Sequence, residues 1–271
     1  WWVALSGYLV KDLGFTSCKL GQAFFTNRKK CGTLMIMMTV HVDDLLVVTD
    51  GSRESEACVD QLLKKYSITD VKAVSKLDGG VEYTGQTIEV KLGPHGDEAH
   101  VHHKKFIQGR FEQIAISKQR RGEAGSSCTP LETSEFRSAV GSMHWTTSLA
   151  RPDGVFDTNQ LQKRQAKATV GDLKNANKAI TAIKNTPNEV LRNIPLSNNM
   201  AVMVWTDSAL YNSEGEWLGE DPDLAGYGRH SVYSQAGALI GRTNADDLDN
   251  DGDHPLSILD WRSRATKRVV T

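Results

Sequence analysis

Two adjacent carboxylates interrupt an apolar run near residue 43. In the stretch MTVHVDDLLVV, residues 38–48, Asp43 and Asp44 are flanked on both sides by valine and leucine. Two unit charges about 4 Å apart repel by roughly 1 kcal/mol in water and roughly 4 kcal/mol at an effective dielectric constant of 20. An exposed turn tolerates the smaller cost, so a plain turn is one interpretation. The other is a Mg²⁺ site for phosphoryl or nucleotidyl transfer, which would need at least one further carboxylate.

The acidic stretch DLDNDGD, from Asp247 to Asp253, also has oxygen ligands at metal-binding spacing. It matches the start of a calcium loop, whose twelfth position normally holds a bidentate Glu. Here that position is Ile258, and the pattern predicts no flanking helices. We therefore favour a solvated acidic loop, with a calcium-binding interaction module as the alternative.

The segment HGDEAHVHH supplies four histidines, two of which would face the same side of a strand. A zinc site would need a further ligand at zinc-like spacing, so a polar strand edge is the favoured interpretation. The absence of a C-x-x-C pair argues against a zinc site or a disulfide framework and is typical of a reducing compartment. The histidines are His95, His100, His102 and His103, and the cysteines are Cys18, Cys31, Cys58 and Cys128.

Two helix-like segments carry an excess of basic residues. Residues 104–121 contain six Lys and Arg against Glu112, and residues 163–184 contain six against Asp172. Such a stripe can meet the phosphate backbone of a nucleic acid, although the charge count alone favours a solvated helix face. The candidates for phosphate contact are Lys104, Lys105, Arg110, Lys163, Arg164 and Lys167.

The composition indicates a folded chain of about two domains. It has 271 residues, of which 39% are hydrophobic, and a net charge of −1, so nucleic acid would have to be held by local basic patches. The longest uncharged apolar run is far shorter than the roughly 20 residues that span a bilayer, and no signal peptide is visible, so no membrane partner is expected. The chain begins without Met inside an amphipathic pattern, from which we expect a fragment of a larger protein.

Hydrophobic periodicity and capping signals predict the elements that must position these residues. The β-type runs on either side of Asp43 and Asp44 predict a hairpin, and Ser52 is the expected N-cap of the helix that follows. The pattern as a whole indicates an α+β fold. Helices are predicted at 1–13, 52–66, 104–116, 134–149 and 171–187, and strands at 79–93 and, beyond a boundary near residue 196, at 201–207, 234–241 and 256–261.

Several segments resemble one known family. HVDDLLVVTD resembles the Y-V-D-D-[IL]-[LI] hairpin of reverse transcriptases, specifically those of copia-type retrotransposons, and residues 1–25 resemble the W-x-x-x-L-x-x-x-L segment that precedes it. Residues 136–163 resemble the family's segment with V-G-S-L, R-P-D and N-x-L, here with Arg151-Pro152-Asp153 and Asn159 in register. MVWTDSAL and SILDWRSRATKRVVT resemble two strands of the ribonuclease H domain that follows the polymerase. The five segments occur in the family's order over nearly the whole chain.

The resemblance implies a division into three parts. These are the second half of a reverse transcriptase palm at residues 1–93, a mostly helical thumb and connection at 94–195, and the N-terminal part of a ribonuclease H-like α/β domain at 196–271. The implied partners are an RNA/DNA template-primer, an RNA–DNA hybrid and the rest of the Pol polyprotein. The implied location is an element particle in the cytoplasm or the nucleus.

The resemblance also implies roles for individual residues. Asp43 and Asp44 match the polymerase metal-binding pair, and Asp207 matches the first metal-binding carboxylate of ribonuclease H, with Mg²⁺ as the cofactor at both sites. The alternative for Asp207 is an aspartate that simply ends a strand. Arg151 and Asp153 are expected to be structural, in a connection between two helices.

This sequence departs from the family pattern at several points. His41 replaces the usual Tyr of the hairpin, and Lys267 lies at or beside the place of a usual Gln. The first palm aspartate belongs upstream of the tryptophan motif, and the ribonuclease H glutamate would follow Thr271. We therefore expect a partial or decayed copy in which neither active site is complete. The competing hypothesis is a non-catalytic nucleic-acid-binding remnant, which the same basic helices would serve.

Overall fold

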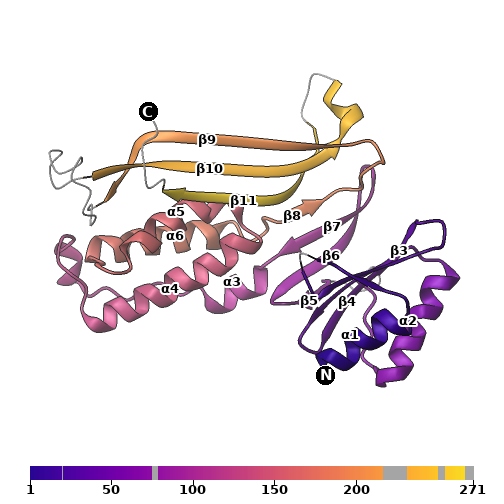
Figure 1. The fold of residues 1–271 in the computed structure, drawn as a ribbon. Helices are drawn as coiled ribbons and strands as arrows, with labels where there is room; N and C mark the ends of the chain where they lie inside the picture. Colours follow the sequence, from indigo (N-terminus) through magenta and orange to yellow (C-terminus); the bar gives the residue numbers. More distant parts are fainter. Residues whose placement is uncertain (20, 75–78, 216–230, 250–253, 266–271) are drawn as a thin grey trace, which may run out of the picture. The chain divides into compact units, whose positions relative to one another are not determined.

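The chain folds into two compact units. The computed structural model describes residues 1–19, 21–74, 79–215, 231–249 and 254–265. One unit comprises Trp1–Leu77 and Val81–Thr84, and the other comprises Asp78–Gly80 and Gly85–Thr271. The two units are described separately below (Figure 1).

The first unit is built on an antiparallel sheet with strand order β1-β2-β3-β4. Its central strand β3 alternates between the two faces of the sheet: Ile36, Met38 and Val40 are buried, whereas the residues between them are only partly covered. This period-2 pattern is what a sheet with one packed face requires. The strands are β1 (Thr16–Ser17), β2 (Phe24–Arg28), β3 (Leu34–His41) and β4 (Asp44–Thr49), and a short strand β5 (Val81–Tyr83) also belongs to this unit.

Two helices cover the packed face of this sheet, α1 (Trp2–Lys11) and α2 (Arg53–Tyr66) (Figure 1). Leu5 and Leu9 of α1 and Leu62 of α2 are buried in one cluster with the β3 side chains. Both helices were predicted, and the expected cap of α2 is confirmed, because Ser52 Oγ accepts a hydrogen bond from the Ser55 amide at 3.3 Å. Val3 of α1, by contrast, is 81% exposed.

The second unit begins with the hairpin of β6 (Gln86–Gly93) and β7 (Gly96–His102), and β8 (Leu191–Asn193) pairs with β7. The predicted strand material around residue 90 is thus confirmed. The segment around Leu191 contains a strand as well, although no helix or strand was predicted over residues 188–200. The β8 pairing depends on residues more than 90 positions apart, which no local pattern reveals.

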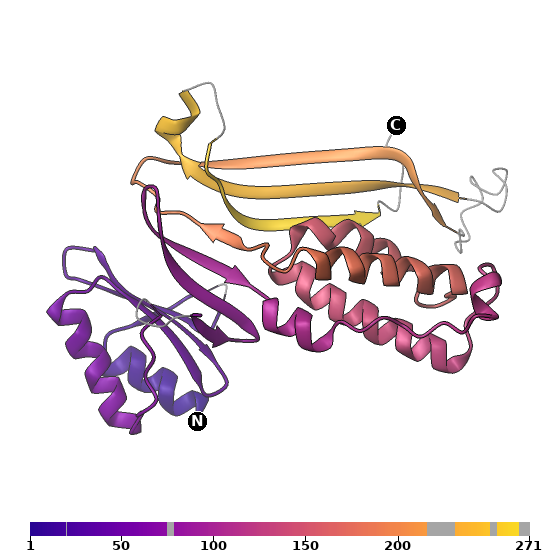
Figure 2. The same ribbon diagram turned by 180° about the vertical axis from the view of Figure 1, so that it is seen from behind.

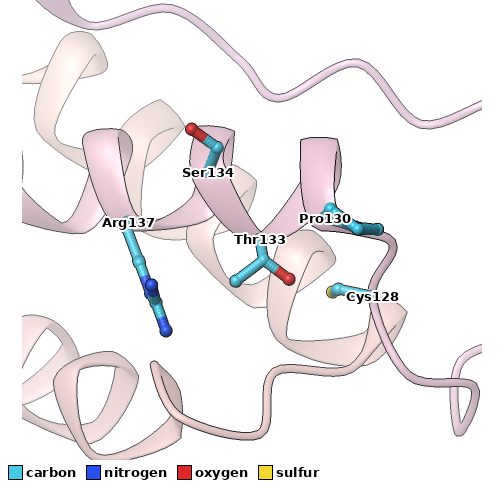
Figure 3. Close-up of a pocket in the computed structure, with 5 residues that line it drawn as sticks. All are labelled: Cys128, Pro130, Thr133, Ser134 and Arg137. Atoms are coloured by element: carbon cyan, nitrogen blue, oxygen red, sulfur yellow. The ribbon is translucent and has the colours of Figure 1, made fainter.

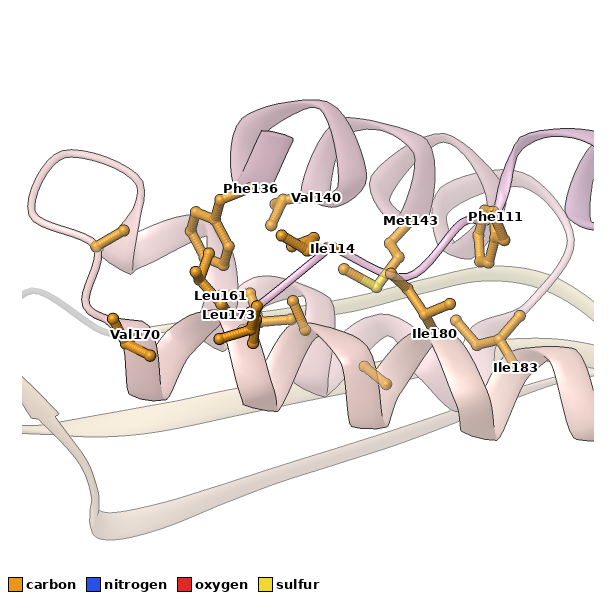
Figure 4. Packing of buried hydrophobic residues seen from close by; sticks show 14 of the residues in the cluster. Phe111, Ile114, Phe136, Val140, Met143, Leu161, Val170, Leu173, Ile180 and Ile183 are labelled. Atoms are coloured by element: carbon orange, nitrogen blue, oxygen red, sulfur yellow. The ribbon is translucent and has the colours of Figure 1, made fainter. Parts of the chain in front are cut away.

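A helical layer forms the main core of this unit (Figure 4). Its helices are α3 (Lys104–Arg110), α4 (Pro130–Leu149), α5 (Val155–Arg164) and α6 (Val170–Asn185). Thr129 and Thr169 each form a capping box at the start of α4 and α6. The apolar positions predicted from 3- and 4-residue spacing are confirmed as core: Phe136, Val140, Met143, Leu173, Ala176, Ile180 and Ile183.

The helix predicted over 104–116 is wrong beyond Arg110. Phe111 ends α3 with extended backbone, and no helix or strand is assigned over residues 112–117. Ile114 and Ile116, two positions apart, are both buried, as alternation in an extended segment requires. Asn177 of α6 satisfies the backbone of Ile114, donating to its carbonyl at 2.9 Å and accepting from its amide at 2.7 Å. We call residues 111–117 the strap.

The R-P-D motif has the structural role that was predicted. Arg151 is 1% exposed, and its guanidinium donates to both carboxylate oxygens of Asp153 at 2.8 and 2.6 Å. It also donates to the carbonyls of Ile183 and Thr186 at the end of α6. The motif therefore connects α4 to α5 and satisfies the last carbonyls of α6, which lack intrahelical partners.

A sheet with order β11-β10-β9 lies beside α5 (Figures 1 and 2). Its strands are β9 (Met200–Gly215), β10 (Ser231–Asn244) and β11 (Ser257–Ala265), which confirms the β-rich pattern predicted beyond residue 196. Trp261 Nε1 donates to the Thr147 carbonyl of α4 at 2.6 Å, and Gln235 of β10 bonds to Asn159 of α5 at 3.2 Å. These bonds fix the sheet on the helical layer.

The mixture of antiparallel sheets and helices confirms the α+β class. The finer division into palm (1–93), thumb and connection (94–195) and ribonuclease H-like part (196–271) stays a prediction. None of the helices in the described ranges is long and apolar enough to cross a bilayer.

Candidate metal centre at the β3–β4 hairpin

Asp43 and Asp44 lie at the tip of the β3–β4 hairpin, as predicted. His41 pairs directly with Asp44, so Val42 and Asp43 alone form the loop. The apolar runs on both sides place Ile36, Met38 and Val40 in the core, which anchors the strands that support the tip. Both carboxylates are exposed, and neither has a hydrogen-bond or ion-pair partner among the described residues. The tip therefore presents two unsatisfied anions.

The backbone at this tip is strained and tied down. Val42 has φ +54°, a left-handed conformation that a β-branched residue rarely adopts. A positive φ at the first loop residue alone is the feature of a type II′ turn, which suits a two-residue hairpin. Trp1 Nε1 donates to the Val42 carbonyl at 2.8 Å, and the Trp1 ring packs edge-on against Tyr66 at 5.2 Å. Trp1, the first residue of the tryptophan motif, thus links the hairpin loop to α2.

Asp44 lies on the open face of the sheet. Since Val40 and Leu45 point to the core, alternation places His41 and Asp44 together on the opposite face. The His41 ring contacts the Tyr83 ring edge-on at 6.5 Å, and the Tyr83 hydroxyl lies 3.4 Å from Thr39 Oγ1. Sequence reasoning missed Tyr83, which brings a phenol beside the histidine that occupies the family's tyrosine position.

The donor set at the tip fits Mg²⁺ in part. Mg²⁺ in proteins is commonly held by one or two carboxylates together with substrate phosphates and water, and Asp43 and Asp44 offer such a pair. A two-metal centre needs more ligands. Across the residues that the structure describes, no group of three or more His, Cys, Asp or Glu side chains is placed to hold a metal ion. The pair by itself therefore falls short of a two-metal centre.

Asp207, the predicted ribonuclease H ligand, lies on β9 and belongs to no metal-binding group among the described residues. It is exposed on β9, opposite Gly237 of β10. Asp207 pairs with Gly237 of β10, which in turn pairs with Ser263 of β11. Ser263 is two residues from Trp261, so the two side chains lie on one face of the sheet, the face toward the helices, and Asp207 lies on that face too. Lys267, the other position noted from the family pattern, lies outside the described residues.

Two of the candidate histidines, His100 and His102, lie in a row of contacts between basic and acidic side chains. Glu98 is 3% exposed and accepts two hydrogen bonds from Arg192, at 2.9 and 2.7 Å, and it also contacts His100 at 3.0 Å. These contacts, led by that with Arg192, hold the pKa of Glu98 down at about 2. His102 faces Glu89 at 3.5 Å. The two histidines share one strand face, as predicted, and they pair with acids there.

The predicted calcium loop is described only in part. Ala245–Asp249 forms a short 3₁₀ helix, and Asp246 accepts a hydrogen bond from Asn199 at 2.6 Å. Residues 250–253 of the candidate loop lie outside the described ranges. Calcium binding therefore stays an untested alternative.

The six basic candidates lie on α3 and at or just after the end of α5. Lys104, Lys105 and Arg110 belong to α3, and Lys104 donates to Asn188 at 3.2 Å. Lys163 at the end of α5 donates to Gln160 and Gln235, and burial lowers its pKa. The other two, Arg164 at the end of α5 and Lys167 just after it, are exposed. Lys163 thus also serves the contact between α5 and β10.

A pocket of about 410 Å³ lies beside the first turns of α4 (Figure 3). Cys128, Thr133 and Arg137 line it, and Arg137 reaches the Gln165 carbonyl at 3.3 Å. Burial raises the pKa of the Cys128 thiol, which keeps it in its unreactive protonated form. The pocket lining contains no histidine or carboxylate to serve as a base.

Comparison with known proteins gives one distant relative. The chain is 22% identical over 282 aligned residues to the "Retrovirus-related Pol polyprotein from transposon RE1" of Arabidopsis thaliana. The alignment covers all of this chain and 16% of that polyprotein. No protein-family model matches the chain, and no solved structure matches it. The similarity supports a fragment derived from a retrotransposon Pol polyprotein.

Proposed function

We propose that this chain is part of a copia-type RNA-directed DNA polymerase with an attached ribonuclease H segment, in which Asp43 and Asp44 are half of the polymerase metal site. The observation that carries the proposal is the position of both carboxylates, exposed and without partners among the described residues, at the tip of a two-residue hairpin. Similarity to a Pol polyprotein along the whole chain supports it.

The role of the pair follows from its chemistry. Two adjacent carboxylates repel each other, and a divalent cation shared with substrate phosphates removes that repulsion. A bound Mg²⁺ supplies charge neutralisation at the phosphate oxygens during nucleotidyl transfer. The hairpin strands hold the carboxylates in place, and Trp1 fixes the loop through its hydrogen bond to the Val42 carbonyl. On the ribonuclease H side, Asp207 would contribute one carboxylate of the second site.

The isolated chain binds Mg²⁺ weakly and does not polymerise under this proposal. The half-site lacks the further carboxylate that two-metal chemistry requires. A primer-extension assay with Mg²⁺ on an RNA template should show no nucleotide incorporation by the purified chain. Robust nucleotide incorporation would refute the proposal that the polymerase metal site of this chain is incomplete.

Paramagnetic relaxation tests the half-site itself. Mn²⁺, added as a stand-in for Mg²⁺, should broaden the backbone amide resonances of residues 41–46 first. The Asp43→Asn and Asp44→Asn double variant should lose this broadening, and an Asp70→Asn and Asp97→Asn variant, with the same charge change at exposed positions elsewhere, should keep it. Equal broadening in both variants would refute metal binding at the hairpin.

A non-catalytic nucleic-acid-binding remnant is the second candidate. The absence of a third ligand near the hairpin, within the described part of the chain, favours it. In this case Mn²⁺ leaves the hairpin resonances unchanged, while the chain still binds an RNA–DNA hybrid. The two measurements together separate the candidates.

A further inference from the structure

A groove of about 780 Å³ runs between the strap and α6, and its lining includes none of the predicted metal ligands. One wall is the strap, with Gln113 and Ala115 facing out, and the other is the outer face of α6. Lys174, Lys178 and Asn185 line the helical wall. These three positions are spaced by four and seven residues, so they form one stripe along the helix.

The strap is held rigidly in place. Its core-facing side chains Phe111 and Ile114 are buried, as Figure 4 shows. Its backbone is bonded to α6 by side chains: Asn177 pairs with Ile114, and Lys184 donates to the Phe111 carbonyl at 2.9 Å. Because the walls are fixed before any ligand arrives, binding there carries little ordering cost.

The groove lining is strongly basic. It includes Arg121, Lys174 and Lys178 and contains no acidic residue. Lys174 donates to the Arg121 carbonyl, and Arg121 Nε donates to the Ile116 carbonyl at 3.0 Å, which aligns these two cations along the groove. Lys178 is exposed and has no partner among the described residues. The remaining guanidinium donors and two ammonium groups are available to an anion.

We propose that this groove binds the phosphate backbone of a single nucleic-acid strand. The stripe from Lys174 to Asn185 is about 16 Å long at 1.5 Å per residue, which is long enough to follow consecutive phosphates of one strand. The lining is free of aromatic side chains, so bases would not stack and recognition would be independent of sequence. The Thr181 hydroxyl donates to the Asn177 carbonyl at 2.8 Å and accepts from the Gln113 amide at 2.9 Å. The second amide proton of Gln113 and the amide of Asn185 are the neutral donors that the lining offers to phosphate or sugar oxygens.

This inference rests on the nucleic-acid partner of the proposed function but not on its metal site. None of the three groove cations is among the six basic residues predicted from sequence. All three lie within the two basic segments noted from the sequence, and the groove brings these segments together through contacts between residues 63 positions apart.

The experiment measures binding of a short fluorescein-labelled oligouridylate to the full chain by fluorescence anisotropy over a salt series. The Arg121→Gln and Lys178→Gln double variant leaves the Lys174 contact intact. It should reduce the slope of log K against log salt by about 1.4, from two contacts at about 0.7 each. The matched control is Lys11→Gln with Lys64→Gln, two exposed helix cations of the first unit, which should keep the wild-type slope.

The outcomes separate the groove from the wider proposal. If the wild-type chain binds the oligonucleotide and the groove variant keeps the full slope, the groove assignment is wrong and the nucleic-acid partner stands. If the wild-type chain binds no RNA even at low salt, the nucleic-acid partner is wrong as well. If polyglutamate of equal length displaces the oligonucleotide at equal concentration, the groove takes acidic polypeptide and the phosphate assignment is overturned.

Discussion

Two turns in this molecule carry aspartates that the family resemblance singled out, the V-D-D hairpin of the first unit and the R-P-D turn of the second. Asp153 accepts two hydrogen bonds from Arg151, whose other donors close the end of α6. Asp43 and Asp44 accept none within the described structure. The difference separates a carboxylate used by the fold from carboxylates left available to a ligand.

This contrast has an energetic basis. Buried polar groups are nearly always hydrogen-bonded, because an unsatisfied one costs about 1–3 kcal/mol. Arg151 meets this demand completely, so its removal should damage the fold. The hairpin carboxylates are solvated and contribute nothing comparable, so their removal should spare it. The predictions below test each side, from the largest effect to the smallest.

Replacing Arg151 tests the structural side. Arg151→Met leaves the Ile183 and Thr186 carbonyls and the Asp153 carboxylate without their donor. We expect the free energy of unfolding to fall by about 3 kcal/mol, measured by urea denaturation followed by circular dichroism.

Arg151→Lys is the control for this change. It keeps the charge but not the planar fork of donors, so it should recover only part of the loss. A loss below about 1 kcal/mol in the Met variant would show that the turn is not the structural element described here.

A pH series examines a second buried group of the same unit. His103 is 2% exposed, its Nε2 has no partner in the described structure, and its ring stacks on Trp145. Burial lowers its pKa from 6.5 to about 4. The unfolded chain therefore binds the proton more readily, and stability should fall as the pH drops from about 6.5 toward 4, by about 3 kcal/mol at the lower end.

The measurement is urea denaturation at a series of pH values in the wild type and in His103→Leu. The variant should lose the pH dependence in this window. The contribution of Glu98, whose pKa is lowered from 4.5 to about 2, begins to be lost below about pH 4.5. This loss is common to both proteins, so the difference between them isolates His103. An unchanged slope in the variant would contradict the assignment to His103.

The strained loop residue of the hairpin offers a third test. Val42→Gly relieves a left-handed conformation that costs about 1–3 kcal/mol, at an entropic cost of about 0.5–1 kcal/mol. We expect a net gain of about 1 kcal/mol in a thermal melt. Val48→Gly, at an exposed position of β4 with regular strand geometry, should instead destabilise. Destabilisation by both changes would show that the loop is not strained.

The smallest effect is expected at the carboxylates themselves. Asp43→Asn with Asp44→Asn removes a repulsion of about 1 kcal/mol or less in water, so the melting temperature should stay the same or rise slightly. Differential scanning calorimetry without divalent ions measures this. A clear loss of stability would mean that the pair has structural partners, and the contrast with Asp153 would fail.

Much of the fold follows from local patterns. The period-2 runs on both sides of Asp43 and Asp44 predicted the hairpin, and the Ser52 cap with its acidic first turn predicted α2. The spacing of Phe136, Val140 and Met143 predicted the buried face of α4. These features depend on neighbours within a few residues, so the sequence expresses them directly.

The candidate site could be predicted only in outline. The positions of Asp43 and Asp44 at a hairpin tip were recoverable, whereas the contact of Tyr83 with His41 and the hold of Trp1 on Val42 were not, because each joins residues more than 40 positions apart. The partners of the basic residues could not be predicted from sequence either. Lys163 and Lys184 bond to protein acceptors that are distant in the sequence.

The sequence by itself determined which residues alternate, that Ser52 caps α2 and where two carboxylates meet on a turn. Only the tertiary structure decided that the strap is extended and that cations line it. Taken by itself, the spacing of apolar residues in 104–116 fits a helix as well as an extended segment. Asn177 resolves the choice by bonding the Ile114 backbone from a helix 63 residues away, since a polar backbone group at the edge of the core needs a partner.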